Sequence, residues 1–341
     1  MSPNKKKIKV LQYGFGPIGQ ETVRAVLKKE GLELIGVVDI NPKFIGKDVG
    51  EILGEKKLGI IVKQSLAEAL NGQKADIALH TTTSFVKSVK PQLEELIRAG
   101  INVVSSTEEL LIPHLQNPEA AKEIDELAKA YNVTILGTGV NPGFIMDTLP
   151  LFLSSTCLDV KKIEARREVD AGTRRLPLQK KVGAGLDIDD FKKLAKEKKL
   201  GHIGLIESIA LIAEGLGWKL DDIQESVEPV IADKHYKTKY LEVQKGQAAG
   251  LKHVAKGFKN KEELIQLDLR IYVGAKEPFD YIHIIGTPEI KCKFEGGIAG
   301  DQATVASLIN SIPRVLKASP GLVTMYKLPI PYALINSNAL S

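Results

Sequence analysis

Short apolar runs alternate with segments of helical periodicity through the first part of the chain. Runs of strand length occur at residues 8–11, 34–38, 76–80, 101–105 and 133–136, and apolar residues recur at helical spacing over 20–29, 86–99 and 118–131. Strands that alternate with helices are typical of a parallel sheet with helices on both faces. The pattern predicts an α/β fold in which residues 1–150 form a Rossmann-type, doubly wound parallel sheet.

The pattern changes at about residue 161. Strand-like runs follow at 161–169, 239–244, 263–272, 280–285 and 290–294, with helices at 189–198 and 203–216 and a glycine- and arginine-containing connection at 170–185. This order predicts an α+β second domain over 151–299, with a mixed, mostly antiparallel sheet. The last segment, about 300–341, is expected to be a C-terminal helix that packs back on the first domain.

The first strand-like run leads into a glycine turn. Gly14, Gly16 and Gly19 form G-x-G-x-x-G, with Pro17 and Ile18 between the last two. In a dinucleotide site the first glycine permits the turn, the second admits the pyrophosphate and the third allows the helix to pack close to the strand. The alternative is a tight strand–helix turn without a ligand.

An acidic residue stands at the end of the second strand-like run. Asp39 follows Gly19 by twenty residues, the spacing at which a carboxylate accepts the ribose hydroxyls of an adenosine. A carboxylate there would repel a 2′-phosphate. The sequence therefore favours NAD, with NADP as the alternative.

Polar residues follow the third and fifth strand-like runs, where open α/β sheets bind ligands. Thr81, Thr82 and Thr83 are expected to line the nicotinamide ribose, and they could at the same time cap the following helix. His80 is expected to be a hydrogen-bonded core residue. The turn after the fifth run adds Asn141 as a cofactor residue, and Thr138, Pro142 and Phe144 as substrate residues.

The composition narrows the class of protein. The chain has 341 residues, a net charge of +5 and two cysteines, Cys157 and Cys292. The cysteines lack zinc-site spacing, so no metal is expected. A run of three lysines at residues 5–7 is better explained as a solvated tail than as a nucleic-acid patch. Without an apolar run of membrane-spanning length, a cytoplasmic enzyme that binds neither membrane nor nucleic acid is expected.

Several longer motifs resemble those of a known family. They are GFGPIG (14–19), STEELLIP (106–113), GTGVNPGFIMD (137–147), RRLPLQKKVGAGL (174–186), GHIGLIES (201–208) and the segment 300–325. Over nearly the whole chain they resemble 2,4-diaminopentanoate dehydrogenases and related native amine dehydrogenases. The N-terminal half also resembles dihydrodipicolinate reductases. Those reductases carry a histidine pair and a lysine where this chain has RREVDAGTRR (166–175), which argues against their reaction.

The resemblance implies a nicotinamide-dependent oxidative deamination of a short amine, reversible as reductive amination of a ketone with ammonia. The expected substrate is 2,4-diaminopentanoate and the product 2-amino-4-oxopentanoate. It also implies a catalytic glutamate in the segment 106–113, where Glu108 is the expected residue and Glu109 the alternative. Apolar neighbours would raise the pKa of such a carboxyl toward the working range of an acid–base catalyst. The alternative is that both glutamates only complement a helix dipole.

The second domain supplies the remaining candidates. Arg167 and Arg174 could hold a substrate carboxylate in a bidentate fork, or they could form surface or interdomain ion pairs. His202, in the GHIGLIES motif, is a further substrate candidate. The strands between 239 and 294 offer a sheet face through which a homodimer is expected. A reductase of the dihydrodipicolinate reductase type and a nicotinamide-sensing regulator are the rival functions.

Overall fold

The computed structural model describes residues 7–334 of the chain. These form two compact units: one contains the residues up to Phe144 and those from Gly300 onward, and the other is Ile145–Ala299. The division falls just before position 150, the boundary expected from the sequence pattern. Lys5 and Lys6 of the lysine run lie outside the described residues. Within residues 7–334, no helix has both the length and the apolar character needed to cross a bilayer.

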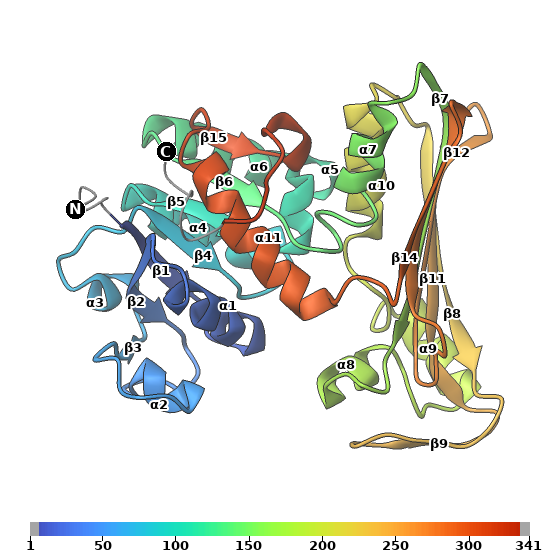
Figure 1. The fold of residues 1–341 in the computed structure, drawn as a ribbon, viewed down its shortest axis with the longest axis horizontal. Coiled ribbons are helices and arrows are strands. Elements are labelled where there is room, and N and C mark those ends of the chain that lie inside the picture. Colours follow the sequence, from blue (N-terminus) through green and yellow to red (C-terminus); the bar gives the residue numbers. More distant parts are fainter. Residues whose placement is uncertain (1–6, 335–341) are drawn as a thin grey trace. The chain divides into compact units, whose positions relative to one another are not determined.

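The first unit is built on a seven-stranded parallel sheet (Figure 1). Its strand order is β15-β6-β5-β4-β1-β2-β3, so the chain reverses its direction of travel across the sheet between β1 and β4. Such a switch point opens a crevice at the carboxyl ends of the strands. The predicted Rossmann-type sheet is confirmed. The strands are β1 Ile8–Tyr13, β2 Leu32–Val38, β3 Val62–Lys63, β4 Ile77–His80, β5 Asn102–Ser105, β6 Thr134–Gly137 and β15 Gly321–Val323.

Helices cover both faces of this sheet. Helices α1 and α11 pack against each other on one face, while α3, α4 and α6 form a core with the strands on the other (Figure 1). The central strands are mostly apolar because both of their faces are buried. The elements are α1 Pro17–Leu27, α2 Val49–Leu53, α3 Leu66–Leu70, α4 Val86–Arg98, α5 Pro113–Gln116, α6 Pro118–Ala130, α11 Gly300–Val315, and the 3₁₀ helices η1 Glu108–Leu111 and η2 Met325–Lys327.

The prediction of one helix over about 300–341 was wrong. Helix α11 ends at Val315, and the chain then forms the edge strand β15 beside β6. Pro320 lacks the N–H that a helix needs, and Gly321 has a φ of 130°, which is incompatible with a helix. The Gly321 N–H instead donates to the Val133 carbonyl at 2.9 Å. The final part of the predicted range, 335–341, lies outside the described residues.

The second unit is built on a six-stranded sheet in the order β14-β13-β7-β12-β11-β8. Strands β7 and β12 pair in parallel, and the other neighbours pair antiparallel. The predicted mixed, mostly antiparallel sheet is confirmed. Its strands are β7 Asp159–Asp170, β8 Asp222–Ile231, β11 Ala248–Lys259, β12 Glu262–Tyr272, β13 Phe279–Thr287 and β14 Ile290–Glu295.

Several local features of this unit differ from the prediction. Strands β8 and β11 were missed because polar residues and glycines interrupt their apolar pattern. The strand expected at 239–244 is a hairpin of β9 Tyr236–Lys237 and β10 Glu242–Val243, because Thr238 Oγ1 accepts from the Tyr240 and Leu241 N–H groups and holds a turn. The helices are α7 Thr148–Ser154, α8 Leu176–Lys181 (inside the predicted connection), α9 Ile188–Lys196 and α10 Leu205–Gly215.

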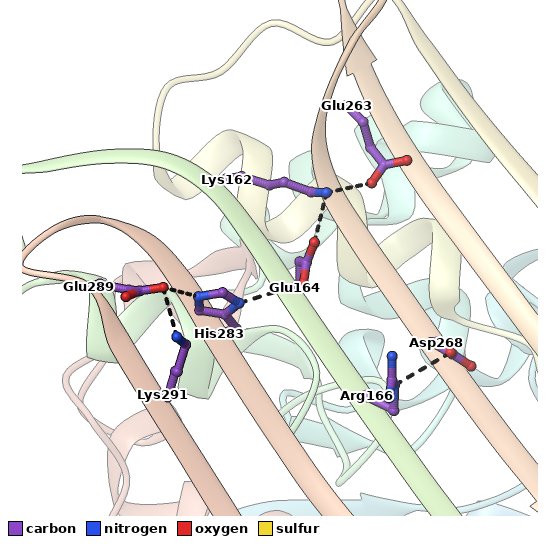
Figure 2. A network of polar contacts seen from close by, with 8 residues as sticks. All are labelled: Lys162, Glu164, Arg166, Glu263, Asp268, His283, Glu289 and Lys291. Atoms are coloured by element: carbon purple, nitrogen blue, oxygen red, sulfur yellow. Dashed lines mark hydrogen bonds and ion pairs between the residues drawn. The ribbon is translucent and has the colours of Figure 1, made fainter.

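The two faces of this sheet differ in chemistry. One is apolar and packs against α7 and α10. The opposite face carries a network of ion pairs (Figure 2). Lys162 Nζ lies 2.7 Å from carboxylate oxygens of both Glu164 and Glu263, and His283 Nε2 lies 2.6 Å from Glu289. Alternating side chains along each strand produce this separation.

Candidate active site

The glycine turn after β1 has no room for side chains at two of its three glycines. A Cβ on Gly14, whose φ is 89°, would lie 2.6 Å from the Thr81 carbonyl oxygen, and one on Gly19 would lie 2.1 Å from the Gly14 carbonyl oxygen. A Cβ on Gly16 would meet nothing within 4 Å, so this glycine borders open space. Gly16 is also the N-cap of α1, and Pro17 begins the helix. The helix thus starts without a capping side chain, as a phosphate-binding terminus requires.

Asp39 lies beside this turn. Its carboxylate accepts hydrogen bonds from the backbone N–H groups of Phe15 and Asn41. These bonds fix the side chain next to the glycine turn and use about half of the four acceptor positions of a carboxylate. The remaining acceptor positions can accept hydrogen bonds from the two hydroxyls of a ribose. The residues present therefore fit the adenosine end of a dinucleotide.

A buried amide fixes the shape of the turn. Gln12 Nε2 donates to the Gly14 carbonyl oxygen and to Thr81 Oγ1, both at 2.8 Å, and Thr81 Oγ1 donates to the same carbonyl at 2.9 Å. The Thr81 hydroxyl therefore stabilises the glycine turn. The sequence analysis missed Gln12, although a polar residue inside an apolar strand was a visible signal.

The ends of β4 and β5 are joined by a hydrogen-bonded chain. His80 is fully buried, its Nδ1 lies 2.8 Å from Ser105 Oγ, and its Nε2 lies 2.8 Å from the Gln92 side-chain amide. Burial lowers the pKa of His80 from 6.5 to about 4, and the bond to Gln92 opposes this only in part. His80 is the hydrogen-bonded core histidine that we expected.

The two candidate glutamates occupy different environments. The Glu109 carboxylate is buried and accepts from the Val86 N–H at 2.7 Å and from Asn117 Nδ2 at 3.1 Å. It therefore stabilises the start of α4 and connects it to the residue before α6. Glu108, the first residue of η1, is half-buried. Consecutive side chains on a helical turn point in different directions, so the engagement of Glu109 leaves Glu108 facing elsewhere.

The turn after β6 approaches η1 closely. A Cβ on Gly137 would lie 2.4 Å from the Leu110 backbone, so glycine is required for this contact. The Thr138 N–H donates to the Ser105 carbonyl, while its buried hydroxyl has no hydrogen-bond partner among the described residues. Pro142 is buried, and Asn141 and Phe144 are half-buried in the same turn. A buried hydroxyl without a partner suits a ligand-lined edge.

Arg167 in the second unit is committed to protein groups. It is 4% exposed; Nη1 donates to both Asp280 carboxylate oxygens at 2.7 Å and Nη2 donates to the Ile298 carbonyl. Burial lowers the pKa of Arg167, and the Asp280 charge opposes that shift. These contacts favour the structural ion pair over a substrate clamp. Arg174 is half-buried, and the buried Gln179 holds its loop by donating to the Arg174 and Gly172 carbonyls.

His202 is fixed through its backbone. Its N–H donates to His253 Nδ1 at 3.1 Å, and His253 Nε2 lies 3.2 Å from Glu225. Because Nδ1 accepts this hydrogen bond, the ring N–H is at Nε2, which faces Glu225. The hydrogen bond with His253 in turn lowers the pKa of Glu225. The sequence analysis missed His253, whose role depends on a strand distant in sequence.

Family models match both parts of the chain. The model of the 2,4-diaminopentanoate dehydrogenase C-terminal domain matches residues 144–340, and that of the dihydrodipicolinate reductase N-terminus matches residues 8–137. A 2,4-diaminopentanoate dehydrogenase of Acetoanaerobium sticklandii is 33% identical over 97% of this chain and 96% of its own. The chain belongs to the 2,4-diaminopentanoate dehydrogenase family.

More distant relatives agree with this assignment. An amine dehydrogenase of Streptomyces virginiae is 24% identical over 95% of this chain and 96% of its own. The structure of an amine dehydrogenase from Mycobacterium smegmatis superposes with a TM-score of 0.83 at 23% identity, covering 96% of this chain and 98% of the other. The latter similarity establishes the shared fold.

Proposed function

We propose that this protein is an NAD-dependent amine dehydrogenase that oxidatively deaminates 2,4-diaminopentanoate, or a similar short amine, and aminates the corresponding ketone in reverse. The observation that carries the proposal is the carboxyl edge of the neighbouring strands β1, β4, β5 and β6. There the glycine turn, the η1 segment with Glu108 and the orphaned Thr138 hydroxyl belong to neighbouring strands of one sheet. Family membership supports the same reaction.

The reaction needs a hydride acceptor and a group that moves protons. Nicotinamide, when bound, accepts the hydride from the amine-bearing carbon of the substrate. Gly14, Gly16, Gly19 and Asp39 would hold the dinucleotide, with Thr82 and Thr83 near its nicotinamide ribose. NADP remains the alternative to NAD.

Glu108 is the proposed acid–base residue. Loss of hydride leaves a cationic iminium, which the carboxylate stabilises electrostatically. Glu108 then takes a proton from the attacking water and gives it to the departing nitrogen, so that ketone and ammonium result. In reverse, the same group protonates the hydroxyl that leaves as water. The engagement of Glu109 with Val86 and Asn117 supports this choice between the neighbours.

Arg174 is the proposed partner of the substrate carboxylate. Burial, and to a smaller extent the nearby charge of Arg174, lowers the pKa of the Arg167 guanidinium. Arg167 is neutralised by Asp280. His202, Pro142 and Phe144 are proposed to line the remainder of the substrate site.

Ammonium dependence tests the function. Purified protein should oxidise NADH in the presence of a short ketone only when ammonium is supplied, and should reduce NAD with 2,4-diaminopentanoate. Ketone reduction without ammonium would favour a reductase, and turnover of the dihydrodipicolinate reductase substrate would favour that reductase type. NADH binding without any turnover would favour a regulator.

A further inference from the structure

The Thr107 hydroxyl connects the η1 turn to the loop after β4. Thr107 is 2% exposed and is the N-cap of η1, directly before Glu108. Its Oγ1 donates to the Thr83 carbonyl oxygen at 2.7 Å and accepts from Ser105 Oγ at 3.0 Å. As an N-cap its side chain does not bond to its own helix. The hydroxyl donates its hydrogen bond to the loop after β4 and accepts one from the end of β5.

Behind Thr107 the chain of hydrogen bonds continues into the core. Ser105 Oγ donates to Thr107 Oγ1 and accepts the Thr107 N–H at 3.1 Å, and His80 Nδ1 lies 2.8 Å from the same Ser105 oxygen. His80 Nε2 also lies 3.1 Å from Thr82 Oγ1. The chain thus begins and ends in the loop that carries Thr82 and Thr83.

Glu108 is therefore flanked by two anchored residues. On one side Thr107 is tied to Thr83, and on the other the Glu109 N–H donates to the Ser84 carbonyl at 3.2 Å while its carboxylate binds Val86 N–H. Both ties lead to the segment between β4 and α4. The half-buried Glu108 side chain consequently has a backbone that is fixed with respect to this loop.

We propose that Thr107 is a positioning residue: its hydroxyl holds Glu108 at a fixed place relative to the cofactor-binding loop Thr81–Thr83. The inference rests on the proposed function, in which Glu108 moves the protons and the loop lines the nicotinamide ribose. Proton transfer requires the carboxyl within hydrogen-bond reach of the reacting atoms. A displacement of about 1 Å can cost about a hundredfold in rate, even when no group of the chemistry is lost.

Two substitutions separate the hydroxyl from the bulk of the side chain. Thr107→Val keeps the branched shape but removes the bonds to Thr83 and Ser105, whereas Thr107→Ser keeps the hydroxyl. We expect Thr107→Val to lower kcat by about tenfold to a hundredfold, with Thr107→Ser close to wild type. The measured rate of each variant is divided by the concentration of NADH-binding sites, which fluorescence titration gives. Misfolded protein therefore does not lower the resulting kcat.

A double-mutant cycle tests the coupling to Glu108. If Thr107 acts through Glu108, adding Thr107→Val to Glu108→Gln should cause little further loss in the residual rate. Additive losses would overturn the proposal, as would a wild-type kcat for Thr107→Val, equal losses in the valine and serine variants, or a loss explained by fewer NADH-binding sites. A fully active Glu108→Gln enzyme would instead refute the proposed acid–base role and remove the basis of the inference.

Discussion

Single residues decide the chemistry at the carboxyl edge of the first unit's sheet. Glu108 and Glu109 are identical side chains at adjacent positions, yet Glu109 is buried and bound by Val86 and Asn117 while Glu108 is half-buried. Likewise, Asp39 is held against the glycine turn by two backbone N–H groups. The surroundings of each carboxylate thus differ in ways that the residue type does not reveal.

Replacing Glu108 should affect chemistry without affecting cofactor binding. General acid–base catalysis is typically worth about a hundred- to ten-thousand-fold, so Glu108→Gln should lose at least about a hundredfold in kcat. NADH binding, followed by fluorescence, should be unchanged. Glu109→Gln is the matched control and should mainly lower thermal stability. If the control loses kcat and Glu108→Gln does not, the assignment of the two residues is reversed.

Replacing Asp39 should change the preference between cofactors. Asp39→Ala removes the acceptor for the ribose hydroxyls and the charge that would repel a 2′-phosphate. The KM for NAD should rise. The ratio of kcat/KM for NAD to kcat/KM for NADP should fall. Asp39→Asn, which keeps the shape, should have an intermediate effect. An unchanged ratio in both variants would contradict the assignment of Asp39 to the ribose.

His80 should make the stability of the protein depend on pH. Its folded-state pKa of about 4 lies below the ordinary 6.5, so between these values the unfolded chain binds a proton that the folded chain does not. The free energy of unfolding should therefore fall as the pH falls below 6.5. Between about pH 6.5 and 5 the loss should be about 2 kcal/mol.

Urea unfolding of wild type and His80→Asn over this pH window measures that contribution. The variant should be less stable at neutral pH. Its free energy of unfolding should decline less on acidification because His80 no longer contributes, although the other histidines still do in both proteins. The same pH dependence in the two proteins would mean that His80 is not the group responsible.

Whole elements are positioned by a few buried polar contacts. In the second unit, the Arg167–Asp280 pair joins β7 to β13 and also binds the backbone of Ile298 on both its N–H and carbonyl groups. In the first unit, Gly137 allows η1 to approach β6, as its missing side chain would otherwise meet Leu110. These contacts join segments that are far apart in the sequence.

Breaking the Arg167–Asp280 pair should destabilise the second unit strongly. Arg167→Met leaves the Asp280 carboxylate buried without its partner, which typically costs about 3–5 kcal/mol. The control is Arg166→Met on the opposite face of β7, where the side chain is 47% exposed and its ion pair with Asp268 is longer, at 3.5 Å. Urea unfolding should show a large loss for the first variant and a small one for the second. Comparable stabilities would contradict the structural role of Arg167.

At the scale of the whole molecule, the polar face of the second unit's sheet is the proposed homodimer surface. It carries charges of both signs, in a network around Lys162, Glu164 and His283 and in a separate pair of Arg166 with Asp268 (Figure 2). Such a surface can complement its own copy around a two-fold axis. The alternative is that the ion pairs cover a sheet face that is exposed to solvent in a monomer. The oligomeric state distinguishes the two.

Sedimentation velocity at micromolar concentration should show a dimer. Arg166→Glu reverses a charge on the proposed surface and should shift the equilibrium toward the monomer. Lys122→Glu on α6 changes the net charge equally at a side chain that is 76% exposed on the first unit, and should leave the dimer intact. A wild-type monomer, or equal effects of both substitutions, would contradict the proposed interface.

The sequence by itself determined the features that depend on local patterns. Alternating apolar segments specified the parallel sheet, and G-x-G-x-x-G with Asp39 specified the candidate cofactor turn, because strand and helix periods and the φ of Gly14 are properties of neighbouring residues. Only the tertiary structure distinguished Glu109 from Glu108, tied Arg167 to Asp280 and placed β15 beside β6. Each of these outcomes depends on a hydrogen-bond partner at least 23 positions away in the sequence: Val86 for Glu109, Asp280 for Arg167 and Val133 for Gly321. No local pattern records such partners.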